Sequence, residues 1–450
     1  MPPAIIIIRP VTREIAKRVY FRIKKVNAQA RSVERAEQVA PLTTVPGSGL
    51  LPPVAIFNNY WAPTLAFAYS LGRQGVPLHV YGSGAAQSSK YCVRHSSCPA
   101  PENTDTFLPW LRDRIRSGEI VRIAPTTDLI AYYISLLREE FPAEVQRTIP
   151  SLAEIESTLI KSRFCDRCEA VGQAVPRTYY PENLSAALQA AKDLQYPLIM
   201  KPKAHIAIGS AERGCVIRDE RSLRERFRAY PFEAGQEAIG ARYPELLWPL
   251  LQRYLISAHS RVYSVSGFKD RDAGILASSL SFKREQWPAD MGTSTVQVSH
   301  TDDRILQAGL KAVDSLVTCG IFELELVTDN GALLAIDLNP RAFGFINLDI
   351  ALGRDLPWLW FCSTMGRIEH PVHSEQAGVI EARHSIIHFL IYLSKLRAPK
   401  SVDAAANRRD PQRPRAYIPL VGSWSDPVPL LLANVRMLRH PRSLLRSIFR

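Results

Sequence analysis

Two apolar segments that meet at a tight-turn sequence constrain the fold of this chain most strongly. They read CGIFELELVTDNG (319–331) and LLAIDLNPRAFG (333–344), and Asp329, Asn330 and Gly331 lie where the first segment ends. An Asn-Gly pair between alternating apolar residues is a strong turn signal. The two segments are therefore predicted to form a β-hairpin.

Acidic side chains occupy positions in these strands where a half-buried sheet normally carries Val or Thr. Side chains alternate along a strand, so Glu323 and Glu325 share one face, as do Asp337 and Asn339. Such acids need a cation or hydrogen bonds to offset their desolvation. Carboxylates and an amide oxygen suit Mg²⁺ that also holds ATP phosphates, and the planar fork of Arg341 suits a phosphate. The alternative is that these residues simply close a surface strand.

The size and composition of the chain are those of a soluble enzyme. Its 450 residues predict two or three domains, and its apolar content of 46% and charged content of 22% are ordinary. The seven cysteines are an odd, dispersed set, which argues against a disulfide framework and for a reducing cytoplasm. Cys165 and Cys168 form a CxxC without a second pair at zinc-site spacing, so we expect two ordinary helix cysteines.

Positive charge is concentrated at the two ends of the chain. Residues 1–38 carry a net charge of +6 and residues 395–450 carry +9, whereas the whole chain carries +13. The segments 11–25 and 430–450 alternate basic and apolar residues and are predicted to form amphipathic helices. Such ends suit an anionic membrane surface or an acidic partner, or they are the solvated faces of docked helices. Nucleic acid is not expected as a partner, because no recognised binding module accompanies the charge.

Neither a membrane span nor a secretory signal is expected. The apolar run 5–8 is too short to span a bilayer, and the run 386–393 is typical of a buried helix. The N-terminus lacks the apolar core and cleavage site of a secretory signal. We therefore expect a cytoplasmic protein, with peripheral contact to the inner face of the membrane left open.

The first half of the chain predicts an α/β domain. Residues 1–50 are expected to form the basic helix and a linker. A strand–helix–strand pattern follows in 53–82, and a further strand, loop and helix follow in 120–141. A doubly wound parallel sheet is thus predicted for 51–150. The GSG at 82–84 lacks the spacing of a dinucleotide-binding fingerprint.

The next region, 151–375, mixes helices with a largely antiparallel set of strands, and 376–450 is expected to be a basic helical segment. The overall fold class is therefore α/β plus α+β. The main expected elements are helices at 155–172, 184–194, 222–230 and 302–319, strands at 196–203, 250–255, 260–267 and 274–284, and a loop at 286–295.

Cations and glycines precede the acidic hairpin. Lys201 ends an apolar strand, where a lysine is costly unless its ammonium meets an anion. A single such lysine is usually a surface residue. The candidate set is larger, however, and with the acidic hairpin it contains the parts of a phosphoryl-transfer site. Its further members are the cations Lys161, Lys203, Lys283 and Arg284, and the loop glycines Gly209 and Gly214.

In the order of these features the chain resembles the ATP-grasp enzymes, and within them the predicted ATP-dependent carboxylate–amine ligases. The resemblance covers about residues 53–370. It rests on an N-terminal αβ domain, a strand ending in lysines, a loop ending in GTST and a hairpin closing in DLNPR, in that order. It implies an ATP-grasp fold with antiparallel sheets after the parallel domain.

The resemblance also implies a role for each candidate residue. Lys161, Lys201 and Lys203 would bind the ATP phosphates, under a 204–215 loop that contains Gly209 and Gly214. Gln252, Tyr254 and Leu255 would belong to the hinge strand that bonds adenine through its backbone. Glu323, Asp337 and Asn339 would hold Mg²⁺, with Mn²⁺ as a substitute, and Lys283 and Arg341 would face the transferred phosphoryl group.

The implied activity is ATP-dependent ligation of a small-molecule carboxylate to an amine through an acyl phosphate. Substrate choice is expected at Asn58, Asn59, Tyr60 and Trp61 and in the loop 284–300, unless the first four residues only form a turn. A homodimer is among the expected assemblies.

Three positions depart from the family's usual pattern. Asp337 stands where the family usually has Glu, Ile160 where an acid is frequent, and Arg253 where Glu is frequent. The alternative is therefore a catalytically impaired nucleotide-binding protein docked at a membrane surface or an assembly. A NAD-dependent enzyme is disfavoured by the missing glycine fingerprint.

Overall fold

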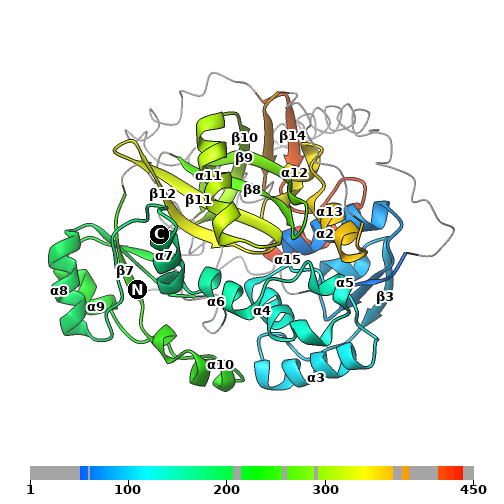
Figure 1. Ribbon diagram of the computed structural model, residues 1–450, viewed down its shortest axis with the longest axis horizontal. Coiled ribbons are helices and arrows are strands. Elements are labelled where there is room, and N and C mark those ends of the chain that lie inside the picture. The colour runs from blue at the N-terminus through cyan, green and yellow to red at the C-terminus, as the bar shows by residue number, and fades with distance from the viewer. Residues whose placement is uncertain are drawn as a thin grey trace, which may run out of the picture.

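The computed structural model describes residues 51–438 except 59–60, 205, 207–213, 256–260, 288–291, 368–377 and 385–413. The expected N-terminal helix, the apolar run 386–393 and the end of the expected C-terminal helix lie outside the described residues. In the view of Figure 1, a small sheet with α8 and α9 lies at one end, the N-terminal sheet lies at the other, and a large sheet lies above them.

The N-terminal sheet is parallel, as the sequence predicted. Its strands β1 (Val54–Phe57), β2 (Leu78–Tyr81) and β3 (Cys92–Ser96) lie in that order, and a parallel bridge from Ala55 to Ile123 adds the segment before α4. The strands β1 and β2, with α2 (Trp61–Arg73) between them, form the strand–helix–strand pattern predicted at 53–82. The other helical elements of this part are η1 (Ala85–Ser88), α3 (Thr104–Arg116), α4 (Asp128–Leu136), η2 (Arg138–Glu140) and α5 (Ala143–Gln146).

The single helix expected at 155–172 is wrong, because the structure has two helices there. They are α6 (Leu152–Leu159) and α7 (Lys161–Ala170), separated by Ile160 in an extended conformation with φ −91° and ψ 111°. No Gly or Pro marks this break in the sequence. The break frees the backbone N–H of Lys161, which donates to the carbonyl of Lys203 at 2.8 Å. Lys161 therefore begins α7 beside the chain that leaves β5.

The small sheet is antiparallel and has four strands in the order β4-β7-β5-β6. Alanines and leucines of α8 pack on its apolar strands in one core cluster. The helix expected at 222–230 is shorter and ends at Arg226. The elements are β4 (Thr178–Tyr179), α8 (Leu184–Leu194), β5 (Leu198–Lys201), β6 (Cys215–Ile217), α9 (Glu220–Arg226), α10 (Glu237–Arg242), η3 (Pro244–Leu247) and β7 (Leu250–Arg253).

The large sheet has seven strands in the order β12-β11-β8-β9-β10-β13-β14, antiparallel except for the last pair. Helix α11 (Asp303–Leu316) packs its apolar side on one face, together with residues of α7. The strands are β8 (Val262–Asp270), β9 (Gly274–Trp287), β10 (Thr293–His300), β11 (Gly320–Asp329), β12 (Ala332–Asn339), β13 (Ile380–Arg383) and β14 (Ala416–Pro419).

The predicted hairpin is confirmed. Strands β11 and β12 pair around Asn330 (φ 47°) and Gly331 (φ 83°). The loop expected at 286–295 is shorter than predicted, because β9 extends to Trp287 and β10 begins at Thr293, and these two residues pair. Residues 288–291 lie outside the described residues. The polar residues of this segment carry no alternating apolar signal. Strands β13 and β14 follow residue 376, so that part of the chain is not helical throughout.

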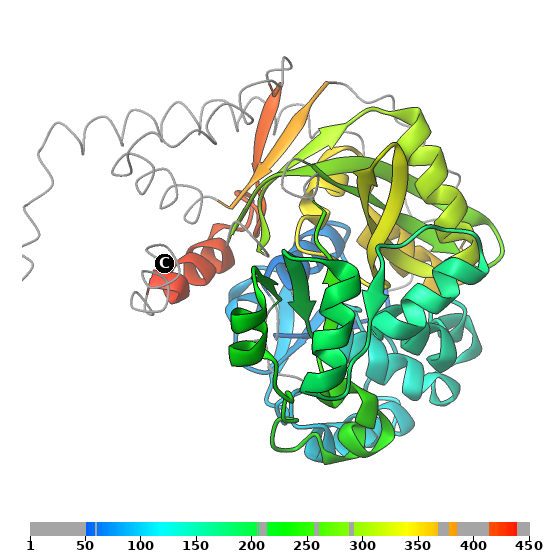
Figure 2. The ribbon, with the colours of Figure 1, turned by 90° about the vertical axis from the view of Figure 1, so that its left-hand side faces the viewer.

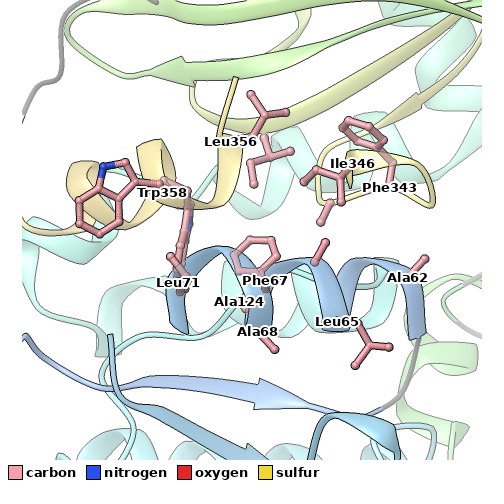
Figure 3. Packing of buried hydrophobic residues seen from close by; sticks show 14 of the residues in the cluster. Ala62, Leu65, Phe67, Ala68, Leu71, Ala124, Phe343, Ile346, Leu356 and Trp358 are labelled. Atoms are coloured by element: carbon pink, nitrogen blue, oxygen red, sulfur yellow. The ribbon is translucent and has the colours of Figure 1, made fainter. Parts of the chain in front are cut away.

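The N-terminal unit shares its core with the end of the chain. Helix α2 packs against α12 (Ile346–Ala351) and α13 (Leu356–Thr364) in one buried cluster. In Figure 3, Phe67 and Leu71 of α2 face Ile346, Leu356 and Trp358. Helix α15 (Pro427–Leu438) contacts η1 and α2. None of the helices described is long and apolar enough to cross a membrane.

Candidate active site

The acidic residues of the hairpin lie opposite one another on adjacent strands. Glu323 pairs with Asn339 and Glu325 pairs with Asp337 in the register of β11 and β12. Partners in an antiparallel ladder project to the same face, so all four side chains share one surface. Asn339 Nδ2 donates to Glu323 Oε2 at 2.7 Å, which joins the two strands at the base of the site.

Glu323 is the most buried of these acids. Burial, followed by the charge of Glu325, raises the pKa of Glu323 to about 7, although Lys283 and hydrogen bonds from Ser264 and Asn339 act in the opposite direction. Ser264 Oγ donates to its Oε1 at 2.8 Å. Its negative charge is thus incompletely compensated by the chain, and an added cation would stabilise its ionised form.

Two lysines from other elements meet the outer pair of acids. Lys283 of β9 contacts Glu325 Oε1 at 2.5 Å, and Lys161 forms an ion pair with Asp337. Burial alone would lower the pKa of Lys283, but the charges of Glu325 and Glu323 outweigh burial and raise it. Both lysines therefore lie next to carboxylates of the hairpin.

Lys201 lies at the same site but lacks such a neighbour. It ends β5, and both Lys161 and Asp337 act electrostatically on its ammonium. Burial, and then the charge of Lys161, lower the pKa of Lys201. Among the residues that the structure describes, none accepts a hydrogen bond from it. An anion beside Lys201 would offset its burial and its repulsion from Lys161.

Arg341 connects the hairpin to the N-terminal unit. Its Nη2 donates to Asn339 Oδ1 at 3.0 Å and its Nη1 donates to the carbonyl of Ala342 at 2.7 Å. Its Nε donates to Asp128 Oδ1 at 2.6 Å. Asp128 is the first residue of α4, after Thr127, whose hydroxyl caps the helix. No role in the site was predicted for Asp128 from the sequence, although an acid after a strand of the predicted parallel sheet was an available signal.

The structure does not bring Lys203 into this cluster. Its ammonium donates to the carbonyl of Glu245 at 2.7 Å, and the charges that act on it are those of Glu182 and Glu245. Burial lowers the pKa of Lys203. Gly209 lies outside the described residues, and Gly214 directly precedes β6.

The expected hinge residues lie at the end of β7, an inner strand of the small sheet, with Tyr254 and Leu255 directly after it. Gln252 lies in β7 and its Nε2 donates to Thr178 Oγ1 at 2.8 Å. Leu255 is buried in a small cluster with residues of β8, β11 and β12. Arg253, one of the departures from the family pattern, contacts Asp329 at 3.1 Å. The arginine therefore ties this segment to the hairpin turn.

Of the expected substrate-selecting residues, only Asn58 has a described side chain. Its Nδ2 donates to the carbonyl of Gly82 at 2.7 Å, and its Oδ1 accepts from the N–H of Ala86 at 3.2 Å. Asn58 thus braces the loops after β1 and β2. Asn59 and Tyr60 lie outside the described residues, and Trp61 begins α2.

The donor set suits a divalent cation that is shared with a ligand. In the described ranges, no group of three or more His, Cys, Asp and Glu residues could hold a metal by itself. Glu323, Asp337 and Asn339 offer oxygen donors on one face, and Glu323 carries incompletely compensated charge. Mg²⁺ commonly takes one or two carboxylates and completes its shell with water and phosphate oxygens. The residues therefore fit Mg²⁺ only together with a phosphate ligand.

Comparison with sequence families and curated proteins gives no match, since no family model and no curated protein matches this chain. Solved structures do match. The biotin carboxylase domain of Hydrogenobacter thermophilus 2-oxoglutarate carboxylase, in complex with MgADP, ADP and bicarbonate, has a TM-score of 0.56 and 15% identity over 72% of this chain and 73% of that one.

Two further structures are similar to a comparable degree. Staphylococcus aureus N5-carboxyaminoimidazole synthetase has a TM-score of 0.54 and 16% identity, over 73% of this chain and 80% of that chain. Bacillus licheniformis L-amino acid ligase has a TM-score of 0.53 and 13% identity, over 74% and 80%. All three are ATP-grasp enzymes, so the fold class that the sequence predicted is confirmed.

Proposed function

We propose that this chain, which has the fold of ATP-grasp enzymes, ligates a carboxylate to an amine at the expense of ATP. The observation that carries the proposal is the position of Lys201, a half-buried cation next to the Lys161–Asp337 pair that lacks an anionic contact of its own in the described chain. A nucleotide phosphate would supply that contact.

The neighbouring charges support the same proposal. Each of Lys161 and Lys283 is already matched to one carboxylate of the hairpin. Mg²⁺ held by Glu323, Asp337 and Asn339 would neutralise phosphate charge, and Mn²⁺ would suit the same oxygen donors. If Asp337 faced a metal ion, its partner Lys161 would be free to contact phosphate oxygens. The chain would thus exchange an internal ion pair for a contact with the nucleotide.

The reaction needs positioning and charge stabilisation more than an acid–base residue. A carboxylate oxygen of the substrate attacks the γ-phosphorus, and ADP leaves. The amine nitrogen then attacks the acyl carbon, phosphate leaves, and the amine gives up a proton as the amide forms. Lys201, Lys283 and Arg341 would stabilise the phosphoryl group during these steps.

The proposed setting is the cytoplasm, with small-molecule acids and amines as partners. All seven cysteines are free in the structure, as expected in a reducing compartment. The use of ATP as a co-substrate fits the same compartment. A homodimer remains an expectation that the oligomeric state in solution can test.

The test begins with binding of ATP and Mg²⁺, measured as a rise in melting temperature, and continues with phosphate release across libraries of carboxylic acids and amines. Lys201→Ala and Asp337→Ala are each expected to slow ATP turnover by about 10²–10³-fold, as does loss of one transition-state donor. Lys192→Ala, at an exposed lysine of α8, is the matched control. Full turnover by Lys201→Ala would reject the assignment.

A second outcome has its own structural support. The side chain of Asp337 is shorter than that of the Glu usual in the family, and its carboxylate is already paired with Lys161. If ATP and Mg²⁺ raise the melting temperature but neither hydrolysis nor ligation occurs with any acid and amine, the chain is a nucleotide-binding interaction protein without turnover.

A further inference from the structure

One short segment holds most of the exposed large apolar side chains of the described chain. Four of the six lie between residues 424 and 432: Trp424 (43% exposed), Val428 (52%), Leu431 (64%) and Leu432 (42%). Scattered apolar residues on a surface are ordinary, but a contiguous group marks an interaction site.

Helix α15 is anchored so that these exposed apolar side chains face outward. Leu430 and Ala433 are buried against the body, and the carboxylate of Asp426 accepts hydrogen bonds from Ser89 and from the N–H of Lys90. Positions 428, 431 and 432 have the spacing of one helical face, opposite that of 430 and 433. Figure 2 shows α15, in red, projecting from the rest of the described chain.

From the start of α15 at Pro427 onward, the charged residues of the sequence have one sign. From Pro427 to the last residue there are five arginines and no acidic residue. The arginines are Arg436, Arg439, Arg442, Arg446 and Arg450. An apolar helix face with an interfacial Trp, joined to a segment with arginines and no acids, has the composition of helices that lie in the headgroup region of anionic bilayers.

We propose that α15 and the segment after it dock the protein on a phospholipid bilayer that contains anionic lipid. Val428, Leu431 and Leu432 would enter the boundary between headgroups and acyl chains, with Trp424 at its edge, and the arginines would contact lipid phosphates. A second copy of this chain fits the face less well, because a symmetric contact would bring two arginine-rich segments together. The proposal is independent of the proposed ligase activity.

The full chain is tested by flotation with vesicles of phosphatidylcholine, with or without phosphatidylglycerol. We expect binding to the anionic vesicles only, weakened by salt. Leu431→Glu should reduce binding by about tenfold or more, since it removes an aliphatic side chain that the bilayer would bury and adds a negative charge. Val171→Glu, at an exposed valine on another element, is the matched control and should bind as the wild type does.

Several results would overturn the proposal. These are no binding to anionic vesicles at low salt, equal binding to both vesicle types, or wild-type binding by Leu431→Glu. A concentration-dependent dimer that Leu431→Glu dissociates, without vesicle binding, would assign the face to a second copy instead. The melting temperature of Leu431→Glu shows that the variant is folded, and vesicle binding without ATP separates this test from that of the ligase.

Discussion

At the scale of single residues, Arg341 and Asp128 show how two parts of the chain build one site. Arg341 follows β12 and contacts Asn339, which in turn contacts Glu323. Asp128 comes from the start of α4 in the N-terminal unit. The orientation of the guanidinium therefore depends on a carboxylate more than two hundred positions earlier in the chain.

Replacing this carboxylate should impair turnover without unfolding the protein. Asp128→Asn removes a charge-assisted hydrogen bond worth about 1.5–3 kcal/mol, so the phosphoryl group would lose a well-oriented Arg341. We expect kcat for ATP turnover to fall by about tenfold or more, with a smaller change in the KM for ATP. Asp128→Glu should recover part of the rate. Unchanged kinetics in Asp128→Asn would show that this contact does not orient the arginine.

A second prediction for a single residue concerns Asp349, which lies in α12, outside the active-site cluster. Burial raises the pKa of Asp349 from 3.8 to about 6, although hydrogen bonds from Ser279 and Ser266 oppose the shift. The folded state therefore holds this proton more tightly than the unfolded chain does. Its contribution to the free energy of unfolding is fully present below about pH 4 and is lost as pH rises to about 6.

Asp349→Asn should remove that pH dependence. Relative to the wild type, the variant should gain up to about 3 kcal/mol in the free energy of unfolding between about pH 4 and pH 7, as a shift of about two pKa units implies. Urea unfolding at both pH values measures the gain. Asp303→Asn, at an exposed aspartate of α11, is the control. A constant difference between wild type and Asp349→Asn would contradict the assignment.

The same scale shows what sequence alone could locate. Alternation along the hairpin strands correctly placed Glu323 with Glu325, and Asp337 with Asn339, because strand periodicity is local, whereas the common face of the two pairs follows from the register of the hairpin. It did not separate Lys201 from Lys203, which stand two residues apart. Strand β5 ends at Lys201, so alternation no longer applies at Lys203 and its ammonium turns toward Glu245. Asp128 could not be paired with Arg341, since that contact depends on how distant elements pack.

At the scale of elements, the best predictions came from segments with a turn signal or a clear period. The hairpin and β1 and β2 were of this kind. The break at Ile160 was not predicted, because no Gly or Pro marks it. The N–H of Lys161 that it frees donates to the carbonyl of Lys203, which is distant in the sequence. Strand β10 was missed for a similar reason, since its pairing with β9 and β13 makes a polar sequence extended.

The turn of the acidic hairpin gives a prediction at this scale. Gly331 has φ 83° and open space around the position of a Cβ, so Gly331→Ala would meet only backbone strain. We expect a loss of about 1–2 kcal/mol in the free energy of unfolding, measured with urea. Asn330→Gly should cost little, because glycine adopts φ 47° readily. An unchanged stability of Gly331→Ala would mean that the turn rearranges at no cost.

At the scale of the whole molecule, the N-terminal sheet has one face packed mainly within its own unit and shares the core on its other face with the end of the chain. Its helix α2 packs against α12 and α13 from the far end of the chain, in one buried cluster. Polar contacts also join α2 to the start of α13, since Ser70 and Arg73 both donate to Asp355. The sequence showed an αβ unit at 51–150 but could not show that its helix α2 is covered by residues more than 270 positions later in the chain.

This shared core predicts that the two parts lose stability together. Phe67 of α2 is fully buried, and its ring lies 5.5 Å from that of Trp360 in α13. Phe67→Ala should lower the free energy of unfolding by about 3–5 kcal/mol through the cavity that it leaves. Urea unfolding can be monitored by circular dichroism and by the loss of ATP–Mg²⁺ binding. The urea midpoints from both probes should then fall by the same amount, in a single transition. Two separate transitions, with only one of them moved, would show that the N-terminal unit is stable without the covering helices.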